Sequence, residues 1–236
     1  MTEKSGYGQF CPLAMAAEFL CKRWTVLILR ELLLGSVSFN DISRGVARMS
    51  RTLLSKRLKE LGQRGLVKKV IKPNHRDTCY ELTVSGKSLS VVVFGMADWS
   101  QEWLHIEPSL KDVDPDHLLW SFRRSARYHP DLPAKFVAHI FFTDQKPSRQ
   151  NGWLIFDDGE VELCIIDHGF DVDVLVEASA VTLTKVYMGW SEFSEEVSSG
   201  NLKLRGPEKY TRNAKKWLGQ SRLANIKKQP MELRVS

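Results

Sequence analysis

Residues 50–64 combine an apolar stripe with a face of side chains that can bind phosphate or the edges of bases. On a helical wheel, Leu54, Leu58 and Leu61 fall within about 60° of one another. The opposite face carries hydroxyl, ammonium and amide groups: Thr52, Ser55, Lys56, Lys59 and Gln63. Lysine is a flexible phosphate contact, and serine and threonine bind either phosphate or bases. The spacing therefore predicts a helix whose polar face enters the major groove of duplex DNA.

The beginning of this helix adds to the same surface. At a helix N-terminus, free backbone N–H groups and the helix dipole both favour phosphate, and arginine can read guanine with two hydrogen bonds. Arg57 and Arg64 fall on the Leu53 side of the wheel and fit salt bridges within the domain better than base contacts. The predicted DNA contacts of the helix are Ser50, Arg51, Thr52, Ser55, Lys56 and Lys59.

Two other groups of reactive side chains form no recognisable site. The acidic residues and His168 between positions 157 and 173 match neither a zinc-protease helix nor a calcium loop, and Asp157-Asp158-Gly159 is typical of a hairpin turn. The cysteines form no CxxC pair and have no histidine at ligand spacing. We therefore predict reduced thiols and no catalytic residue, metal site or cofactor.

The charge of the 236-residue chain is unevenly distributed. Residues 1–107 contain 16 Lys+Arg and 10 Asp+Glu, whereas residues 108–236 contain 18 of each. Between positions 38 and 76, 11 basic residues accompany two acidic ones. A basic block inside a folded segment is the footprint of a polyanion site, although most charge runs are solvated faces. The chain has no apolar run of membrane-spanning length and no signal-peptide core near its start, which predicts a cytoplasmic protein without a membrane partner.

The elements around the polar helix are those that could position it. Helical patterns cover residues 12–21 and 24–34, Ser38 is placed to cap a short helix, and Ser50 and Gly65 are placed to begin and end the polar one. Two extended runs, 66–72 and 78–83, follow as a hairpin. At its tip Asn74, His75 and Arg76 are predicted to touch DNA as a wing, but a solvated turn explains Asn74 and His75 equally well.

A long helix is predicted from a cap at Thr83 to about His105. Apolar residues spaced alternately by three and four form a seam of the coiled-coil type along it. A second apolar set lies off the seam: Val91, Val93, Phe94 and Ala97. A helix with two apolar surfaces usually packs both on its own domain and on a partner. The seam is the predicted dimer interface: Leu89, Val92, Met96, Trp99 and Trp103.

The rest of the chain has a different pattern. Residues 107–116 contain Pro108 and Pro115 and read as a connection between domains. Strands followed by helices then predict an α+β domain. The expected extended runs are 135–142, 151–159, 161–167, 173–178 and 201–206, and the expected helices are 179–189, 191–200 and a closing helix at 209–219.

Residues 7–105 resemble the HxlR-type winged-helix transcription regulators. The motifs that carry the resemblance occur in order: Cys-Pro at 11–12, Arg-Trp at 23–24, Arg-Glu-Leu at 30–32, Ser-Phe-Asn at 38–40, Leu-Ser-Lys-Arg-Leu at 54–58 and Tyr-x-Leu-Thr-x-x-Gly at 80–86. The resemblance implies a homodimer on a near-palindromic DNA operator. It also places at Cys11 a cysteine that some family members use as a redox sensor; the alternative is a small, buried apolar residue.

Residues 109 to about 225 are similar to a C-terminal extension of some family members that looks like a sterol carrier protein type 2 domain. The similarity lies in Gly152-Trp153-Leu154, in 167–173 and in 183–207, although Asp167-His168-Gly169 replaces the usual Asp-Pro-Gly. It implies an apolar cavity and a hydrophobic small-molecule effector.

We therefore expect an α+β protein with two domains. Residues 1–107 are predicted to be a winged helix-turn-helix domain for DNA binding and dimerisation, and residues 108–236 a sterol-carrier-like α+β domain. The predicted function is a DNA-binding transcriptional regulator, not an enzyme. The alternative is a carrier or protein-interaction module whose winged helix contacts protein instead of DNA.

Overall fold

The computed structural model describes residues 6–71, 78–105 and 107–235, and it divides into two compact units. The N-terminal unit is Met1–Ala97 and the C-terminal unit is Asp98–Ser236. The division falls within one helix, whereas the predicted boundary lies between residues 107 and 108. No helix among the described residues has both the length and the apolar character needed to span a bilayer.

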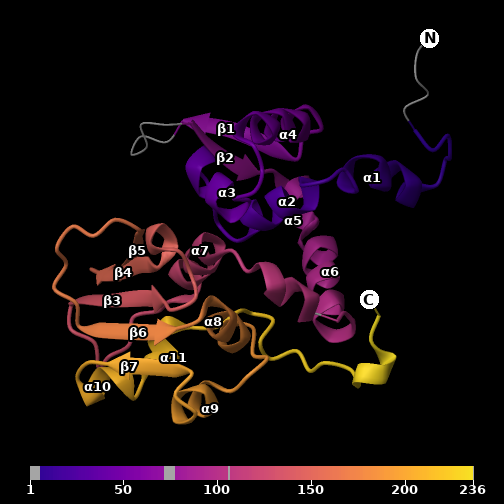
Figure 1. Ribbon diagram of the computed structural model, residues 1–236. Coiled ribbons are helices and arrows are strands. Elements are labelled where there is room, and N and C mark those ends of the chain that lie inside the picture. The colour runs from indigo at the N-terminus through magenta and orange to yellow at the C-terminus, as the bar shows by residue number, and fades with distance from the viewer. Residues whose placement is uncertain (1–5, 72–77, 106, 236) are drawn as a thin grey trace. The chain divides into compact units, whose positions relative to one another are not determined.

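The N-terminal unit is a set of short helices with a two-stranded hairpin (Figure 1). Its elements are α1 (Pro12–Leu20), α2 (Thr25–Leu33), α3 (Phe39–Gly45), α4 (Arg51–Gln63), β1 (Val67–Ile71), β2 (Thr78–Leu82) and α5 (Val84–Ser88), and α6 (Ser90–Trp103) begins in it. Ser38 and Ser50 cap α3 and α4 as predicted, each accepting a backbone N–H three residues on. The helix pair α3–α4 followed by the hairpin confirms the winged helix-turn-helix.

One predicted helix is two. Thr83 caps a helix as expected, but α5 ends at Ser88 and α6 begins at Ser90. The N–H of Leu89 bonds to the carbonyl of Gly86, three residues back, so the turn tightens there. Gly86 lies so close to the backbone of Leu66 that a methyl group at that position would collide with its carbonyl oxygen. Helix α5 therefore packs against the start of the hairpin, and α6 begins after this contact.

The C-terminal unit is built on a five-stranded mixed sheet with strand order β5-β4-β3-β6-β7, as Figure 1 shows. Strands β3 and β6 are parallel, and the other pairs are antiparallel. The strands are β3 (Lys135–Phe142), β4 (Asn151–Asp157), β5 (Glu160–Cys164), β6 (Val174–Ala178) and β7 (Leu202–Arg205). The helices are α7 (Pro115–Ser125), α8 (Ala180–Tyr187), α9 (Phe193–Ser198), α10 (Glu208–Thr211) and α11 (Ala214–Leu218), with 3-10 turns at Glu107–Asp112, Pro147–Arg149 and Met231–Leu233. The α+β prediction is confirmed.

Alternate residues of the strands pack against these helices to form the core of this unit. At its centre Phe136 makes edge-to-face contacts with Phe156, Tyr210 and Trp217 at centroid distances of 5.1 to 5.5 Å. Trp217 is fully buried, and its indole N–H donates to the carbonyl of Tyr210 at 2.9 Å. Aromatic side chains thus fill the space between the sheet and the helices.

Two expectations for this half were wrong. The stretch read as a connection forms a 3-10 turn and then the start of α7, because Asp114 caps the helix and Pro115 occupies its first position, where a missing N–H costs nothing. The closing helix is divided into α10 and α11, with a break at Arg212 and Asn213.

Candidate nucleic-acid interface

Helix α4 has the two faces that its sequence predicted. Leu54, Leu58 and Leu61 are almost completely buried and form part of the core of the N-terminal unit. The predicted DNA contacts of the helix are all exposed: Ser50, Arg51, Thr52, Ser55, Lys56 and Lys59. The hydroxyl of Ser50 accepts the N–H of Leu53 at 3.3 Å, so its side chain fixes the beginning of the helix. The helix therefore displays a continuous polar surface because its apolar stripe is held inside.

Arg51 is the most firmly positioned of these side chains. Its guanidinium lies over the ring of Phe39, 4.7 Å from the centroid, and donates to the side-chain oxygen of Asn40 at 3.0 Å. Both partners belong to α3, and Asn40 is exposed. The sequence reasoning missed Asn40, whose side chain lies beside Arg51 on the same surface. The Ser-Phe-Asn motif just ahead of the polar helix was the signal that could have found it.

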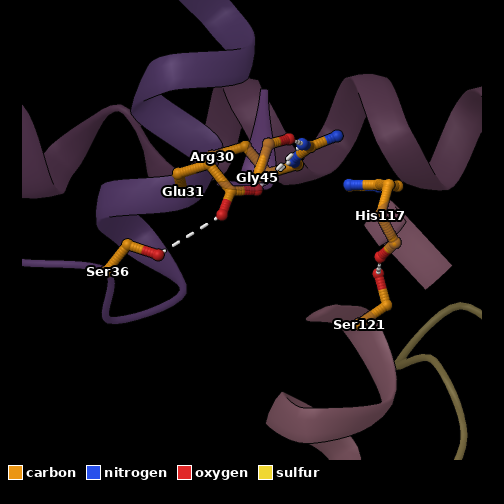
Figure 2. Close-up of polar contacts among 6 residues, drawn as sticks. All are labelled: Arg30, Glu31, Ser36, Gly45, His117 and Ser121. Carbon is orange, nitrogen blue, oxygen red and sulfur yellow. Dashed lines mark hydrogen bonds and ion pairs between the residues drawn. The ribbon is translucent and has the colours of Figure 1, made fainter. Parts of the chain in front are cut away.

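A buried polar network fixes α3 relative to α2 (Figure 2). The carboxylate of Glu31, fully buried in α2, binds the guanidinium of Arg30 at 2.8 Å and accepts from the hydroxyl of Ser36 at 3.3 Å. Arg30 also donates to the carbonyl of Gly45 at 2.9 Å, at the end of α3. A methyl group on Gly45 would collide with the Glu31 carboxylate. The close approach of α3 to α2, and with it the angle at which α4 follows, depends on a glycine and an ion pair.

Arg57 of α4 and Arg64, the residue after the helix, both contact other side chains of the unit. Arg57 forms an ion pair with Glu60 at 2.6 Å, which confirms its reading as a salt-bridge partner. Arg64 instead lies over the ring of Phe19, 4.6 Å from the centroid. Neither side chain lies on the face that carries Lys56 and Lys59.

The wing hairpin is anchored at its base. The register pairs Val67 with Leu82, and the N–H of Tyr80 donates to the carbonyl of Val37 at 2.7 Å. Lys68 pairs with Glu81 across the strands at 3.2 Å, and burial raises the pKa of the Tyr80 phenol. The predicted contacts at the tip, Asn74, His75 and Arg76, lie outside the described residues.

The predicted seam on α6 has a mixed environment. Leu89 is half-buried against the core of the N-terminal unit, and Trp103 is also half-buried. Three residues of the seam are about half exposed, which is a large exposed fraction for apolar side chains: Val92 (47%), Met96 (52%) and Trp99 (51%). Of the off-seam set, Val93 is buried in the core, whereas Val91 is 79% exposed.

Cys11 stands at the N-cap position of α1, and its side chain is exposed. The alternative reading of a small, buried apolar residue is therefore wrong. Phe10 and Leu13, its neighbours, are also exposed.

Within the acidic cluster at 157–173, several residues bind or shape the backbone. Asp158 and Gly159 have positive φ angles of 49° and 81° and join β4 to β5 as the predicted two-residue turn. Asp167 accepts the N–H of Gly169, and Asp173 accepts the N–H of Val137 at 2.8 Å. These carboxylates hold the backbone and do not converge on a common point.

Comparison with known proteins places the first half among transcriptional regulators. Residues 19–108 match the family described as HxlR-like helix-turn-helix. The chain is 38% identical over 106 residues to the uncharacterized HTH-type transcriptional regulator YvaP of Bacillus subtilis, covering 44% of this chain and 96% of YvaP. It is 30% identical over 102 residues to YtfH of Escherichia coli, covering 42% of this chain and 79% of YtfH. The reduced form of YodB from B. subtilis is a similar solved structure, with 33% sequence identity and a TM-score of 0.35. The match covers 39% of this chain and 93% of the YodB chain. These relatives are transcriptional regulators and not enzymes.

Proposed function

The chain belongs to the HxlR-like helix-turn-helix family of transcriptional regulators, and we propose that it binds a DNA operator as a homodimer through the exposed face of α4. The observation that carries the proposal is the separation of the two faces of this helix. Its leucines are buried, and Arg51, Lys56 and Lys59 project outward with hydroxyl side chains between them. A surface of this chemistry suits phosphates and base edges together.

Arg51 is the best candidate for reading a base. Its guanidinium is held by Phe39 and Asn40, so less conformational entropy is lost when it binds than for a free side chain. Lys56 and Lys59 are flexible ammonium groups and suit phosphate. On the basis of the sequence alone, we also include three residues of the wing tip among the proposed DNA contacts: Asn74, His75 and Arg76.

The homodimer is proposed from the apolar surface of α6. Three large apolar side chains, Val92, Met96 and Trp99, are about half exposed at helical spacing, and a partner helix would cover them. Leu89 and Trp103 complete the proposed interface. Two recognition helices related by a two-fold axis would read half-sites about one helical turn, roughly 34 Å, apart.

The C-terminal unit is proposed to be a sterol-carrier-like domain that senses a hydrophobic small molecule. The aromatic side chains around Phe136 are the apolar part of this unit that such a ligand would contact. The end of α6 provides a route for the signal, because Arg222 pairs with Asp98 and Val235 donates its N–H to the carbonyl of Trp103 at 2.8 Å. Both contacts lie within the C-terminal unit, to which the second half of α6 belongs.

Cys11 is proposed to be a redox sensor, because its exposure makes the thiol accessible to oxidants. If oxidation of Cys11 releases DNA, a Cys11→Ser variant keeps its operator affinity in oxidant while the wild type loses it. Equal loss in both proteins would contradict the proposal.

DNA binding is tested by gel shift on the DNA that flanks the gene of this protein. Arg51→Ala or Lys56→Ala should weaken binding by about 1–3 kcal/mol. Lys146→Ala, an exposed lysine of the C-terminal unit, is the matched control and should bind as the wild type does. Unchanged binding in both α4 variants would refute this use of α4. A complete lack of DNA binding by the wild type would favour a protein-interaction module.

A further inference from the structure

A pocket of about 310 Å³ lies in the N-terminal unit beside the inner side of α4. Its walls come from Phe19 of α1, Lys22 of the following turn, Thr25 of α2 and the second half of α4. None of the predicted DNA contacts on α4 lines it. The pocket is therefore a feature separate from the surface proposed to bind DNA.

The side chains of this pocket carry an excess of positive charge. Lys22, Arg57 and Arg64 contribute three cations, and Glu60 contributes one carboxylate. Glu60 already forms an ion pair with Arg57, while the guanidinium of Arg64 lies over Phe19. The local charge favours an anion, and the Phe19 ring adds an apolar wall.

A buried hydroxyl supplies an independent indication of a ligand. Thr25 is 3% exposed, and its Oγ1 has no hydrogen-bond partner among the described residues. A buried hydroxyl without a partner costs about 1–3 kcal/mol, so such groups are rare unless something else binds them. Thr25 therefore offers a hydrogen-bond donor within the wall of a positively charged pocket.

Thr25 is also the first residue of α2, a nine-residue helix whose N-terminus has no side-chain cap. The preceding residue, Trp24, has a φ of 79°, in the left-handed region that an aromatic residue rarely adopts. Thr25 thus stands at the positive end of the helix dipole, while its own backbone N–H already donates to the carbonyl of Lys22 at 3.0 Å. The Thr25 hydroxyl and the helix dipole both favour an oxyanion at this position.

We propose that this pocket binds a small oxyanion, the carboxylate or phosphate group of a metabolite. The hydroxyl of Thr25 donates to one oxygen, and Lys22 and Arg64 balance the charge. Because Arg57, Glu60 and Gln63 belong to α4, the bound anion contacts the inner side of that helix. Any effect of the anion on operator affinity rests on the proposed DNA binding, but binding of the anion itself does not.

The test measures anion binding to the full-length protein without DNA. Isothermal titration calorimetry with sodium phosphate and with sodium benzoate, each compared with sodium chloride at equal ionic strength, distinguishes a phosphate from a carboxylate site. Saturable binding of either anion is expected. Thr25→Val, which keeps the side-chain shape, and Lys22→Gln, at an exposed position, should each weaken it about 10-fold.

The controls separate a lost site from a lost fold. Lys87→Gln removes an exposed lysine of α5 outside this pocket and should bind as the wild type does. Thr25→Val should melt at the wild-type temperature or above it, because it removes a buried hydroxyl without a partner. No saturable binding of phosphate or benzoate, or equal affinity in the wild type and both pocket variants, would overturn the proposal.

Discussion

The two units differ in what their polar side chains contact. In the N-terminal unit, one helix buries three leucines and exposes a row of hydroxyl and cationic side chains, so its surface has a chemical character of its own. In the C-terminal unit, Asp167 holds a turn, and aromatic side chains around Phe136 and Trp217 pack in the core. Residues 1–107 carry the net charge of the chain, and residues 108–236 have equal numbers of basic and acidic residues.

This contrast shows when a sequence reveals function as well as fold. A folded domain needs a polar surface, but its stability does not require cationic side chains to gather on one face of one helix. The cations of the α4 surface therefore indicate an anionic partner. In the C-terminal unit, Asp167 and Asp173 bind backbone N–H groups, and Glu177 pairs with Lys203 and Arg205. The fold of the C-terminal unit follows from its pattern of buried and exposed residues, whereas its ligand stays a proposal.

The largest expected effect tests whether the stability of the C-terminal unit depends on its aromatic core. Trp217→Ala removes a fully buried indole and the hydrogen bond to Tyr210, and should lower the free energy of unfolding of that unit by about 3–5 kcal/mol. Hydrogen exchange reports each unit separately. Amides of β3 should lose protection while those of α2 keep it. The control Ile166→Ala, at a side chain that is 63% exposed, should change little. Equal loss of protection in both units would contradict the division.

A smaller effect is expected for the contact that fixes α3 on α2. Gly45→Ala forces a methyl group against the buried Glu31 carboxylate and should destabilise the N-terminal unit by about 1–3 kcal/mol. Gly62→Ala, within α4, is the matched control. A methyl group at this position would lie 3.5 Å from the carbonyl oxygen of Val67, an ordinary van der Waals distance. This control should raise stability by about 0.5–1 kcal/mol. If denaturation in urea shows the two alanines to be equivalent, the close approach at Gly45 does not constrain the fold.

The smallest effect is a pH dependence at Tyr80. Burial raises the pKa of its phenol above the ordinary 10.0, so the unfolded chain loses this proton before the folded one does. The contribution to stability is complete below pH 10 and is lost as the pH rises from there through the folded pKa. Tyr80→Phe should therefore lose less stability than the wild type between pH 9 and pH 11, as measured by urea denaturation. Parallel curves for the two proteins would contradict the predicted shift.

Local rules were sufficient for much of this molecule. The capping residues Ser38 and Ser50 and the leucine stripe of α4 each follow from interactions within a few residues, and the structure confirms them. The expected extended runs of the second half also match strands, because period-two patterns record which face is buried. The Asp158-Gly159 turn was predictable because both residues tolerate a positive φ.

What the sequence did not predict depends on contacts between distant residues. The break at Leu89 arises where Gly86 packs on Leu66, and no local signal records that contact. Helix α7 was missed because prolines were read as the end of a helix, when Pro115 begins one. Asn40 could not be placed beside Arg51 until the angle between α3 and α4 was known.

The most direct test of the central claim is the salt dependence of DNA binding by the α4 surface. Fluorescence anisotropy of a labelled operator duplex, measured over a range of salt concentrations, gives the slope of log affinity against log salt for each variant. If Lys59 contacts a phosphate, Lys59→Ala should make this slope shallower by about 1, because one fewer counterion is released. Lys146→Ala, at an exposed lysine of the C-terminal unit, should keep the wild-type slope. Wild-type affinity and slope for Arg51→Ala, Lys56→Ala and Lys59→Ala alike would contradict the account.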